Sequence, residues 1–212
     1  MMINILIADD HPIIRRGLRD ILSSESDFTV VGEASHAQEI LAQLRSLKVD
    51  VLLMDITMPG RNGIEVLKDV HLEWPDLPVL MLSIHPEDQY AMRALKAGAS
   101  GYLTKESAPE ELVGAVRKVI DEGRYVSPIM AQRLAAEAGG VNKGAEVHSL
   151  LSDREYDVLL KIGSGLTVSQ IATELSLSVK TVSTYRGRIL EKLQMDSNAA
   201  LIRYVIENNL LS

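Results

Sequence analysis

Four large apolar residues stand in a row at positions 51–54, and a second apolar run covers residues 3–8. Runs that are apolar at every position are typical of strands buried on both faces, as in a parallel sheet. Pro59 and Gly60 prevent the first of these strands from continuing. The pattern therefore predicts two buried strands, one ending at Asp55 and the other at the pair Asp9 and Asp10.

Apolar runs alternate with helical patterns through the first 124 residues. Further strands are expected at residues 28–32, 79–82 and 102–103, and helices at residues 12–22, 37–47, 62–73, 87–96 and 109–120. This alternation predicts an α/β fold with a doubly wound five-stranded parallel sheet, flavodoxin-like in its strand order 2-1-3-4-5. In that order strands 1 and 3 are neighbours, so Asp9, Asp10 and Asp55 are expected to meet at the topological switch point.

The rest of the chain has only helical patterns. Residues 126–138 form an Ala-rich helix, and residues 139–144 include three glycines and predict a flexible linker. Two capping boxes follow, at residues 152–155 and 167–170, opening helices to about residue 162 and over residues 171–175. Ser178 caps a third helix after a very short turn, and a fourth covers residues 198–207. A tight turn between two helices predicts a helix-turn-helix, with the Ser178 helix as the reading helix. We expect domains at residues 1–124 and 148–212, joined by residues 125–147.

Charge and composition narrow the possible functions. The net charge of −7 is uneven: residues 1–124 carry 13 lysines and arginines against 20 acids, whereas the remainder carries nine of each. The helical part can therefore still present a basic face to nucleic acid. The chain lacks cysteine, which excludes disulfides and thiol catalysis. No apolar run is long enough to span a membrane, and no signal peptide precedes the acids at positions 9 and 10, so a cytoplasmic protein is expected.

The three aspartates carry the candidate chemistry of the first part. Magnesium prefers hard oxygen ligands and also relieves the repulsion among neighbouring carboxylates. An aspartate at such a site can attack phosphorus and form an acyl phosphate. Lys105, just after the fifth strand, is placed to neutralise the phosphoryl oxygens. Ser83 lies at the end of the fourth strand, where its hydroxyl could form a hydrogen bond with the same oxygens.

A phosphoester-cleaving enzyme is the competing interpretation. A haloacid-dehalogenase-like phosphatase needs Asp-x-Asp after its first strand, whereas this chain has two adjacent acids there and no second acid two residues after Asp55. Neither a Gly-x-Gly-x-x-Gly motif nor a Walker lysine loop follows Ala8. The sequence therefore favours a protein that is not an enzyme.

Helical phasing at about 100° per residue divides the Ser178 helix into two faces. Val182, Ile189 and Leu193 form an apolar face directed to the core. The opposite face is polar, basic and sterically open, which suits base edges at its centre and phosphates at its rim. The candidate DNA contacts are Lys180, Thr181, Ser183, Thr184, Arg186, Gly187, Arg188 and Lys192. A helical domain that docks on a protein instead remains the alternative.

The acidic pair, the segment Asp55 to Gly60, Ser83, and the segment Gly101 to Lys105 together resemble a response-regulator receiver domain over residues 1–124. This resemblance implies that Asp55 accepts phosphate from a histidine kinase. It implies magnesium bound by Asp10, Asp55 and the Thr57 backbone carbonyl, with Asp9 assisting. It also implies that Ser83 and Tyr102 are paired switch residues.

The segments at residues 151–155, 165–172 and 177–182 resemble the LuxR-type helix-turn-helix, over about residues 148–212. The whole chain therefore resembles a two-component response regulator of the NarL/FixJ family. The resemblance implies a transcription factor that binds double-stranded DNA under the control of phosphorylation, as a homodimer when phosphorylated. In that family the base-reading positions match Ser183, Thr184 and Gly187.

Overall fold

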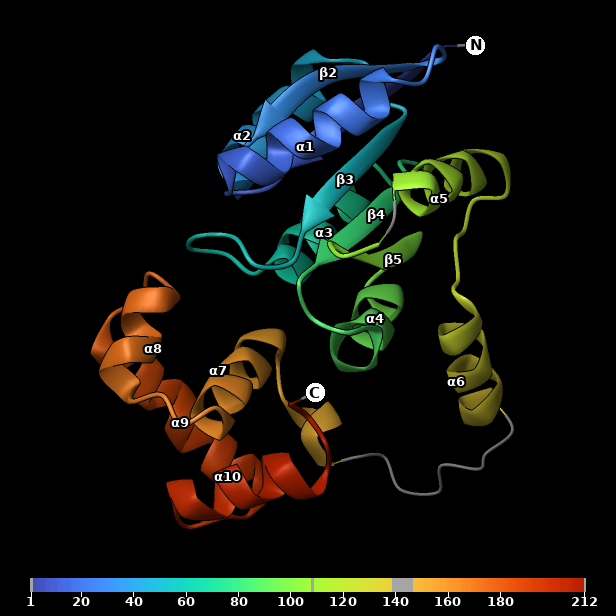
Figure 1. Cartoon of the computed structure of the whole chain (residues 1–212). Helices are drawn as coiled ribbons and strands as arrows, with labels where there is room; N and C mark the ends of the chain where they lie inside the picture. Colours follow the sequence, from blue (N-terminus) through green and yellow to red (C-terminus); the bar gives the residue numbers. More distant parts are fainter. Residues whose placement is uncertain (1, 108, 139–146, 212) are drawn as a thin grey trace. The chain divides into compact units, whose positions relative to one another are not determined.

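The computed structural model describes residues 2–107, 109–138 and 147–211 (Figure 1). The chain divides into two compact units, residues 1–132 and residues 133–212. The linker expected at residues 139–144 lies outside the described residues, and the domain boundaries at residues 124 and 148 stay predictions.

The first unit is built on a five-stranded parallel sheet in the order β2-β1-β3-β4-β5, which confirms the predicted fold. Its strands are β1 (Ile3–Ala8), β2 (Phe28–Ala34), β3 (Val51–Asp55), β4 (Val79–Ser83) and β5 (Gly101–Thr104). Strands β1 and β3 pair directly, with Ala8 opposite Met54. Asp9 and Asp55 therefore leave the sheet at the same edge, from adjacent strands.

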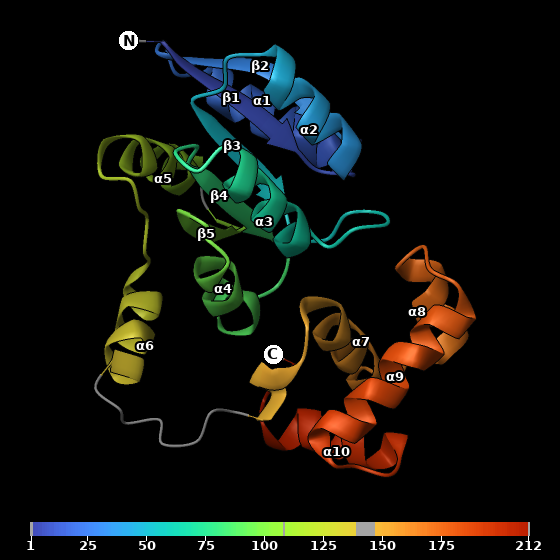
Figure 2. The same ribbon diagram turned by 180° about the vertical axis from the view of Figure 1, so that it is seen from behind.

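Five helices cover the two faces of this sheet. They are α1 (Pro12–Ser23), α2 (Ala37–Ser46), α3 (Gly63–Glu73), α4 (Glu87–Lys96) and α5 (Pro109–Asp121). Helices α1 and α5 lie on one face, and α2, α3 and α4 lie on the other (Figures 1 and 2). Successive side chains of a strand point to opposite faces of the sheet, and both faces of β3 are covered by helices. Leu53 packs into the core cluster that includes residues of α5, whereas its neighbours Leu52 and Met54, which are equally buried, point to the opposite face.

Gly63 fixes the beginning of α3 against the end of β3. A Cβ atom at this position would lie 2.3 Å from the carbonyl oxygen of Asp55 and 2.8 Å from the Cα of Ile56. The Gly63 N–H also donates to the Ile56 carbonyl at 2.7 Å. Only a glycine allows this close approach, so the loop after Asp55 is held tightly beside the sheet.

Helix α6 (Pro128–Ala138) begins two residues later than the sequence pattern predicted. The buried Ser127 explains the start, because its Oγ accepts a hydrogen bond from the Met130 N–H at 3.1 Å and acts as an N-cap. Pro128 then occupies the first helical position, where its missing N–H is not needed. The Ser127 hydroxyl donates to the carboxylate of Glu87, the first residue of α4.

The second unit contains a short 3₁₀ helix η1 (Val147–Leu150) and the helices α7 (Asp153–Gly163), α8 (Val168–Glu174), α9 (Val179–Leu193) and α10 (Asn198–Glu207). Helix α7 packs against both α9 and α10. A Cβ atom at Gly163 would lie 2.5 Å from a methyl group of Val205, so α7 and α10 approach closely there.

Both predicted capping boxes are formed. Ser152 caps α7 with Glu155, and Thr167 caps α8 with Gln170. Because Thr167 is the N-cap, α8 starts at Val168, three residues before the predicted start, and ends one residue earlier than expected. The turn from α8 to α9 is as short as predicted, and Ser176 adopts a left-handed conformation within it.

Candidate functional site

Three carboxylates and one imidazole converge at the carboxyl ends of β1 and β3. One ligand atom from each of Asp9, Asp10, His11 and Asp55 lies within 4.8 Å of the others. Asp9 and Asp55 are buried, whereas the side chain of Asp10 is 26% exposed. The structure therefore brings together the three acids that the strand order placed at this edge, and adds His11, which the sequence analysis did not select.

Lys105 reaches this cluster from the end of β5. Its Nζ lies 2.5 Å from Asp9 Oδ2 and 2.8 Å from Asp55 Oδ2, and its side chain is only 6% exposed. The Lys105 N–H donates to the Ser83 carbonyl at 2.7 Å, which fixes the backbone from which the side chain extends. The ammonium therefore pairs with both buried carboxylates, and its hydrogen bonds to them contribute to the pKa shifts of Asp55 and Lys105.

The charges of the cluster oppose one another. The pKa of Asp55 is raised to about 6: burial is the largest cause and the Asp9 carboxylate adds to it, while the Lys105 ammonium and the Thr57 N–H act to lower it. Burial acts to lower the pKa of Lys105, but the carboxylates of Asp55 and Asp9 outweigh it and leave this pKa raised. A buried acid held partly neutral in this way gains from any additional cation.

The donor set fits a divalent cation with a preference for oxygen. Carboxylates from Asp9, Asp10 and Asp55 are the hard ligands that magnesium takes, and the partial exposure of Asp10 leaves an approach from solvent. Thr57 contacts Asp55 through its main-chain N–H. Its role as a carbonyl ligand stays a prediction.

Ser83 and Tyr102 are linked through one residue, His85. The buried Ser83 Oγ accepts a hydrogen bond from the His85 N–H at 3.0 Å, and the Tyr102 hydroxyl donates to the His85 carbonyl at 2.8 Å. The ring of His85 also lies 5.0 Å from that of Tyr90 on α4. Tyr102 is only 3% exposed, so its ring points into the protein in this structure.

The second unit presents the predicted polar face of α9. Val182, Ile189 and Leu193 are buried, as helical phasing predicted. The exposed residues on the other side are Lys180, Ser183, Thr184, Gly187 and Arg188. A Cβ atom at Gly187 would meet nothing within 4 Å.

Four of the candidate DNA contacts have polar partners inside the domain. Lys192 Nζ lies 2.6 Å from Glu155 Oε2 and 3.3 Å from the Leu150 carbonyl. Arg186 donates to the Asn198 side chain at 2.5 Å. The Thr181 N–H donates to the Ser178 cap, and the Thr184 hydroxyl donates to the Lys180 carbonyl. Of these four residues, Lys192 and Thr184 are still exposed to solvent, whereas Arg186 is partly buried.

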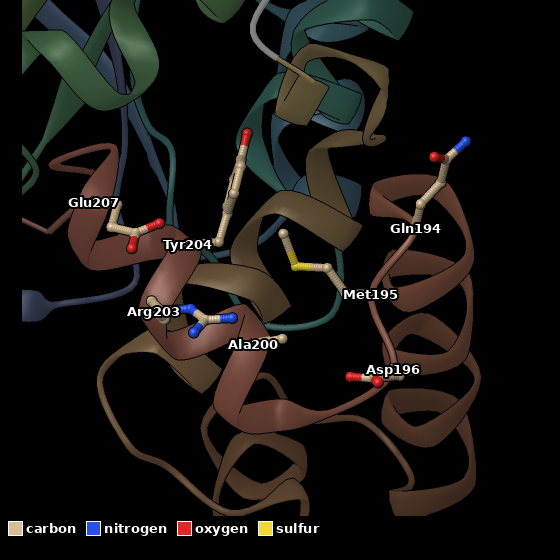
Figure 3. Close-up of a pocket in the computed structure, with 7 residues that line it drawn as sticks. All are labelled: Gln194, Met195, Asp196, Ala200, Arg203, Tyr204 and Glu207. Carbon is tan, nitrogen blue, oxygen red and sulfur yellow. The ribbon is translucent and has the colours of Figure 1, made fainter.

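A shallow pocket of about 450 Å³ lies where α9 passes into α10 (Figure 3). It is lined by Gln194, Met195, Asp196, Ala200, Arg203, Tyr204 and Glu207. None of the candidate site residues lines it, so it is separate from the exposed face of α9. Among the described residues, no helix is sufficiently long and apolar to cross a membrane.

Two family models match the chain. Residues 5–117 match the response regulator receiver domain, and residues 149–205 match the bacterial regulatory proteins of the luxR family. The chain therefore belongs to the two-component response regulators of the NarL/FixJ family, in which a receiver domain is joined to a luxR-type DNA-binding domain.

Individual relatives match over nearly the whole length. The response regulator UvrY of Escherichia coli (strain K12) is 37% identical over 209 residues, which are 99% of this chain and 96% of that protein. The response regulator GacA of Pseudomonas viridiflava is 38% identical over 210 residues, which are 99% and 98% of the two chains.

Solved structures of a similar regulator have the same fold. One structure of RcsB from Salmonella typhimurium has a TM-score of 0.69 at 28% identity, covering 97% of this chain and 98% of that chain. RcsB bound to promoter rprA in the presence of the phosphomimetic BeF3⁻ has a TM-score of 0.65 at 29% identity, covering 96% and 98%.

Proposed function

We propose that Asp55 is the residue that accepts phosphate in this response regulator, and that the acyl phosphate controls DNA binding by α9. The observation that carries the proposal is the position of Lys105 Nζ between the carboxylates of Asp9 and Asp55 at one sheet edge. A histidine kinase is the expected donor, and a cytoplasmic location is part of the proposal.

The chemistry follows from the placement of the side chains. An Asp55 carboxylate oxygen forms a bond to the phosphorus of a phosphohistidine, while the bond from phosphorus to the imidazole nitrogen breaks. Magnesium, held by Asp10 and Asp55 with help from Asp9, supplies charge neutralisation. Lys105 stays beside Asp55 and neutralises the transferred oxygens, which add about −1.5 to −2 charges. The chain is expected to take one phosphate and not to turn over phosphoesters as an enzyme.

The output is proposed to be DNA binding by a homodimer. The exposed Lys180 and Arg188 suit phosphates, and Ser183, Thr184 and Gly187 lie between them on the same face. Support comes from the relatives: RcsB dimers are described bound to DNA, in a structure with a TM-score of 0.60 at 28% identity. One short reading helix contacts few bases, so two copies on half-sites about one DNA turn apart are expected.

Phosphate labelling tests the assignment. Acetyl phosphate with magnesium should label the wild-type protein once, and Asp55→Asn should abolish the label. Asp50→Asn is the matched control, because Asp50 precedes the same strand and bonds the Asn4 N–H at the opposite end of the sheet. Full labelling of Asp55→Asn, or loss of the label in Asp50→Asn, would contradict the assignment.

DNA titration and ultracentrifugation test the output. The phosphorylated protein should sediment as a dimer and bind selected genomic fragments more tightly than the unphosphorylated protein, with a strong salt dependence. Equal mass and equal affinity in both states would reject phosphorylation as the control. Absence of any salt-sensitive DNA binding would favour a helical domain that docks on a protein.

A further inference from the structure

Arg15, in the first turns of α1, bonds the backbone of the acidic cluster. Its Nη1 donates to the main-chain carbonyl of Asp9 at 2.6 Å, and its Nε lies 3.2 Å from Glu33 Oε2 on β2. The side chain is only 17% exposed. The planar guanidinium therefore joins the end of β1 to the neighbouring strand, a bidentate arrangement that lysine cannot reproduce.

The carbonyl that Arg15 holds belongs to the peptide between Asp9 and Asp10. A peptide unit is planar, so fixing its oxygen fixes the directions in which the two flanking residues leave the plane. The N–H of Asp9 is held separately by the Ala34 carbonyl at 3.0 Å, and Asp9 Oδ1 accepts from the His11 N–H at 2.8 Å. With Arg15 on the carbonyl, the turn is held at the Asp9 N–H, the Asp9 carbonyl and the His11 N–H.

The charge of Arg15 alone would work against a cation site, because a guanidinium repels a divalent ion nearby. Glu33 offsets part of this charge. The same carboxylate also pairs with Arg19, whose Nη1 lies 2.5 Å from Glu33 Oε1. Arg19 thus shares the carboxylate, and its bond to Glu33 is the same kind of link between α1 and β2.

We propose that Arg15 is a positioning residue for the cation site, which sets the Asp9–Asp10 turn so that both carboxylates face Asp55, with Glu33 offsetting part of its charge. The proposal rests on the proposed function only in taking that site as the place where magnesium binds.

The effect on magnesium affinity has a sign that separates positioning from simple electrostatics. If Arg15 acts only through its charge, Arg15→Gln should strengthen magnesium binding. If Arg15 positions the turn, Arg15→Gln should weaken it, by about tenfold if the effect resembles that of outer-shell partners at other metal sites. Arg15→Lys keeps the charge, cannot bond both partners, and should also weaken binding.

Calorimetric titration of the full chain with magnesium, without phosphate, measures these affinities. Arg19→Gln is the matched control: it removes a guanidinium from the same Glu33 and should leave affinity within about twofold of the wild type. Circular dichroism checks that each variant is folded, and amide exchange at residues 9–11 should rise in Arg15→Gln but not in Arg19→Gln. Unchanged or tighter binding by Arg15→Gln, or an equal loss in Arg19→Gln, would overturn the proposal.

A second measurement distinguishes this proposal from the proposed function. At saturating magnesium, acetyl phosphate should label Arg15→Gln to the same final extent as the wild type. Only the magnesium concentration needed for half-maximal labelling should rise. Failure of the wild-type protein to be labelled would reject the role of Asp55 as the acceptor. The titrations without phosphate would still decide the role of Arg15.

Discussion

The Tyr102 hydroxyl donates a hydrogen bond to the main-chain carbonyl of His85, at 2.8 Å, from a ring that is almost entirely buried. The N–H of the same His85 donates to the Ser83 hydroxyl oxygen at 3.0 Å. The two proposed switch residues are thus coupled through one backbone segment, immediately before α4. A Ser83 hydroxyl that turned toward a phosphoryl group would release the His85 N–H and disturb the acceptor of Tyr102.

Tyr102→Phe should weaken this coupling and leave the phosphorylation chemistry intact. It removes one partly buried hydrogen bond, so the unfolding free energy should fall by about 1 kcal/mol. Labelling of Asp55 should be unchanged, while the gain in DNA affinity on phosphorylation should shrink. Tyr125→Phe is the control, since the Tyr125 hydroxyl bonds Glu111 and not His85. A full phosphorylation response in Tyr102→Phe would show that this bond carries no signal.

The pKa of Asp55 gives a prediction for stability against pH. Burial raises this pKa to about 6 from 3.8, so the folded state prefers the neutral acid. Such a group makes the protein less stable above pH 6, and stability returns as pH falls from about 6 toward 3.8. Asp55→Asn should therefore be more stable than the wild type at pH 8, by about 1 to 3 kcal/mol.

Denaturant unfolding at pH 8, 6 and 4.5, with a chelator to remove divalent ions, measures this difference. It should shrink steadily as the pH is lowered, and added magnesium should reduce it at pH 8 by stabilising the wild-type carboxylate. Asp55→Asn also loses the ion pair between Asp55 and Lys105, which lowers the stability of the variant and makes the difference smaller. Lys105 keeps its ion pair with Asp9, which limits this loss. A wild type that is the more stable protein at pH 8 without magnesium would contradict the prediction.

The sequence predicted the parts of this molecule that depend on local patterns. The unbroken apolar run before Asp55 specified a central strand, and alternation with helices then determined the strand order and the meeting of Asp55 with Asp9. Ser152 and Thr167 with their partners three residues later were sufficient to predict two helix starts, because a capping box acts within one turn.

Contacts between distant parts of the chain were beyond such patterns. The positive charge of the reading helix placed Lys192 with the candidate DNA contacts, but its ammonium pairs with Glu155, 37 residues earlier in the chain. Arg15 gave no signal in the sequence beyond being a charged residue in a helix. Its bond to Glu33 exists only because β2 lies beside β1, and a residue pattern within one element cannot show which carboxylate a side chain reaches.

The pair Lys192 and Glu155 predicts a pH-dependent stability of the second unit. Burial raises the pKa of Glu155, but the Lys192 ammonium and the Ser152 N–H outweigh it and hold this pKa below 4.5. A lowered pKa contributes stability that is present above pH 4.5 and is lost as the pH falls through the folded value. Glu155→Gln keeps the capping box, so it removes mainly the charge. It should reduce stability at pH 7 by roughly 1 to 2 kcal/mol, since Lys192 is partly exposed.

Amide exchange in α7 and α9 of the full chain, compared at pH 7 and near pH 4, measures the effect. The variant and the wild type should converge at the lower pH. Glu174→Gln is the control, because it breaks the more exposed pair with Lys161 and should change stability by less than about 0.5 kcal/mol. Equal losses in both variants would show that burial of Glu155 does not strengthen its ion pair.

The last prediction concerns Gly187, in the interior of α9. A glycine inside a helix lowers stability by about 1 kcal/mol relative to alanine, and no atom of the residues that the structure describes lies within 4 Å of a Cβ built at this position. The described residues therefore give no reason for a glycine here, whereas the proposed approach of DNA to the helix would give one. Gly187→Ala should increase the unfolding free energy by up to about 1 kcal/mol and at the same time weaken DNA binding.

Gly114 in α5 provides a matched control, because it is also exposed and a Cβ atom there also meets nothing within 4 Å. Gly114→Ala should stabilise the protein to a similar extent and leave DNA affinity unchanged. Arg188→Ala, by comparison, should weaken binding across sequences and reduce the salt slope by about one unit if it contacts a phosphate. Titrations of all three variants with one selected DNA fragment at several salt concentrations separate these effects. If Gly187→Ala binds as tightly as the wild type, the bases do not approach α9 at this position, and the reading face must be centred elsewhere on the helix.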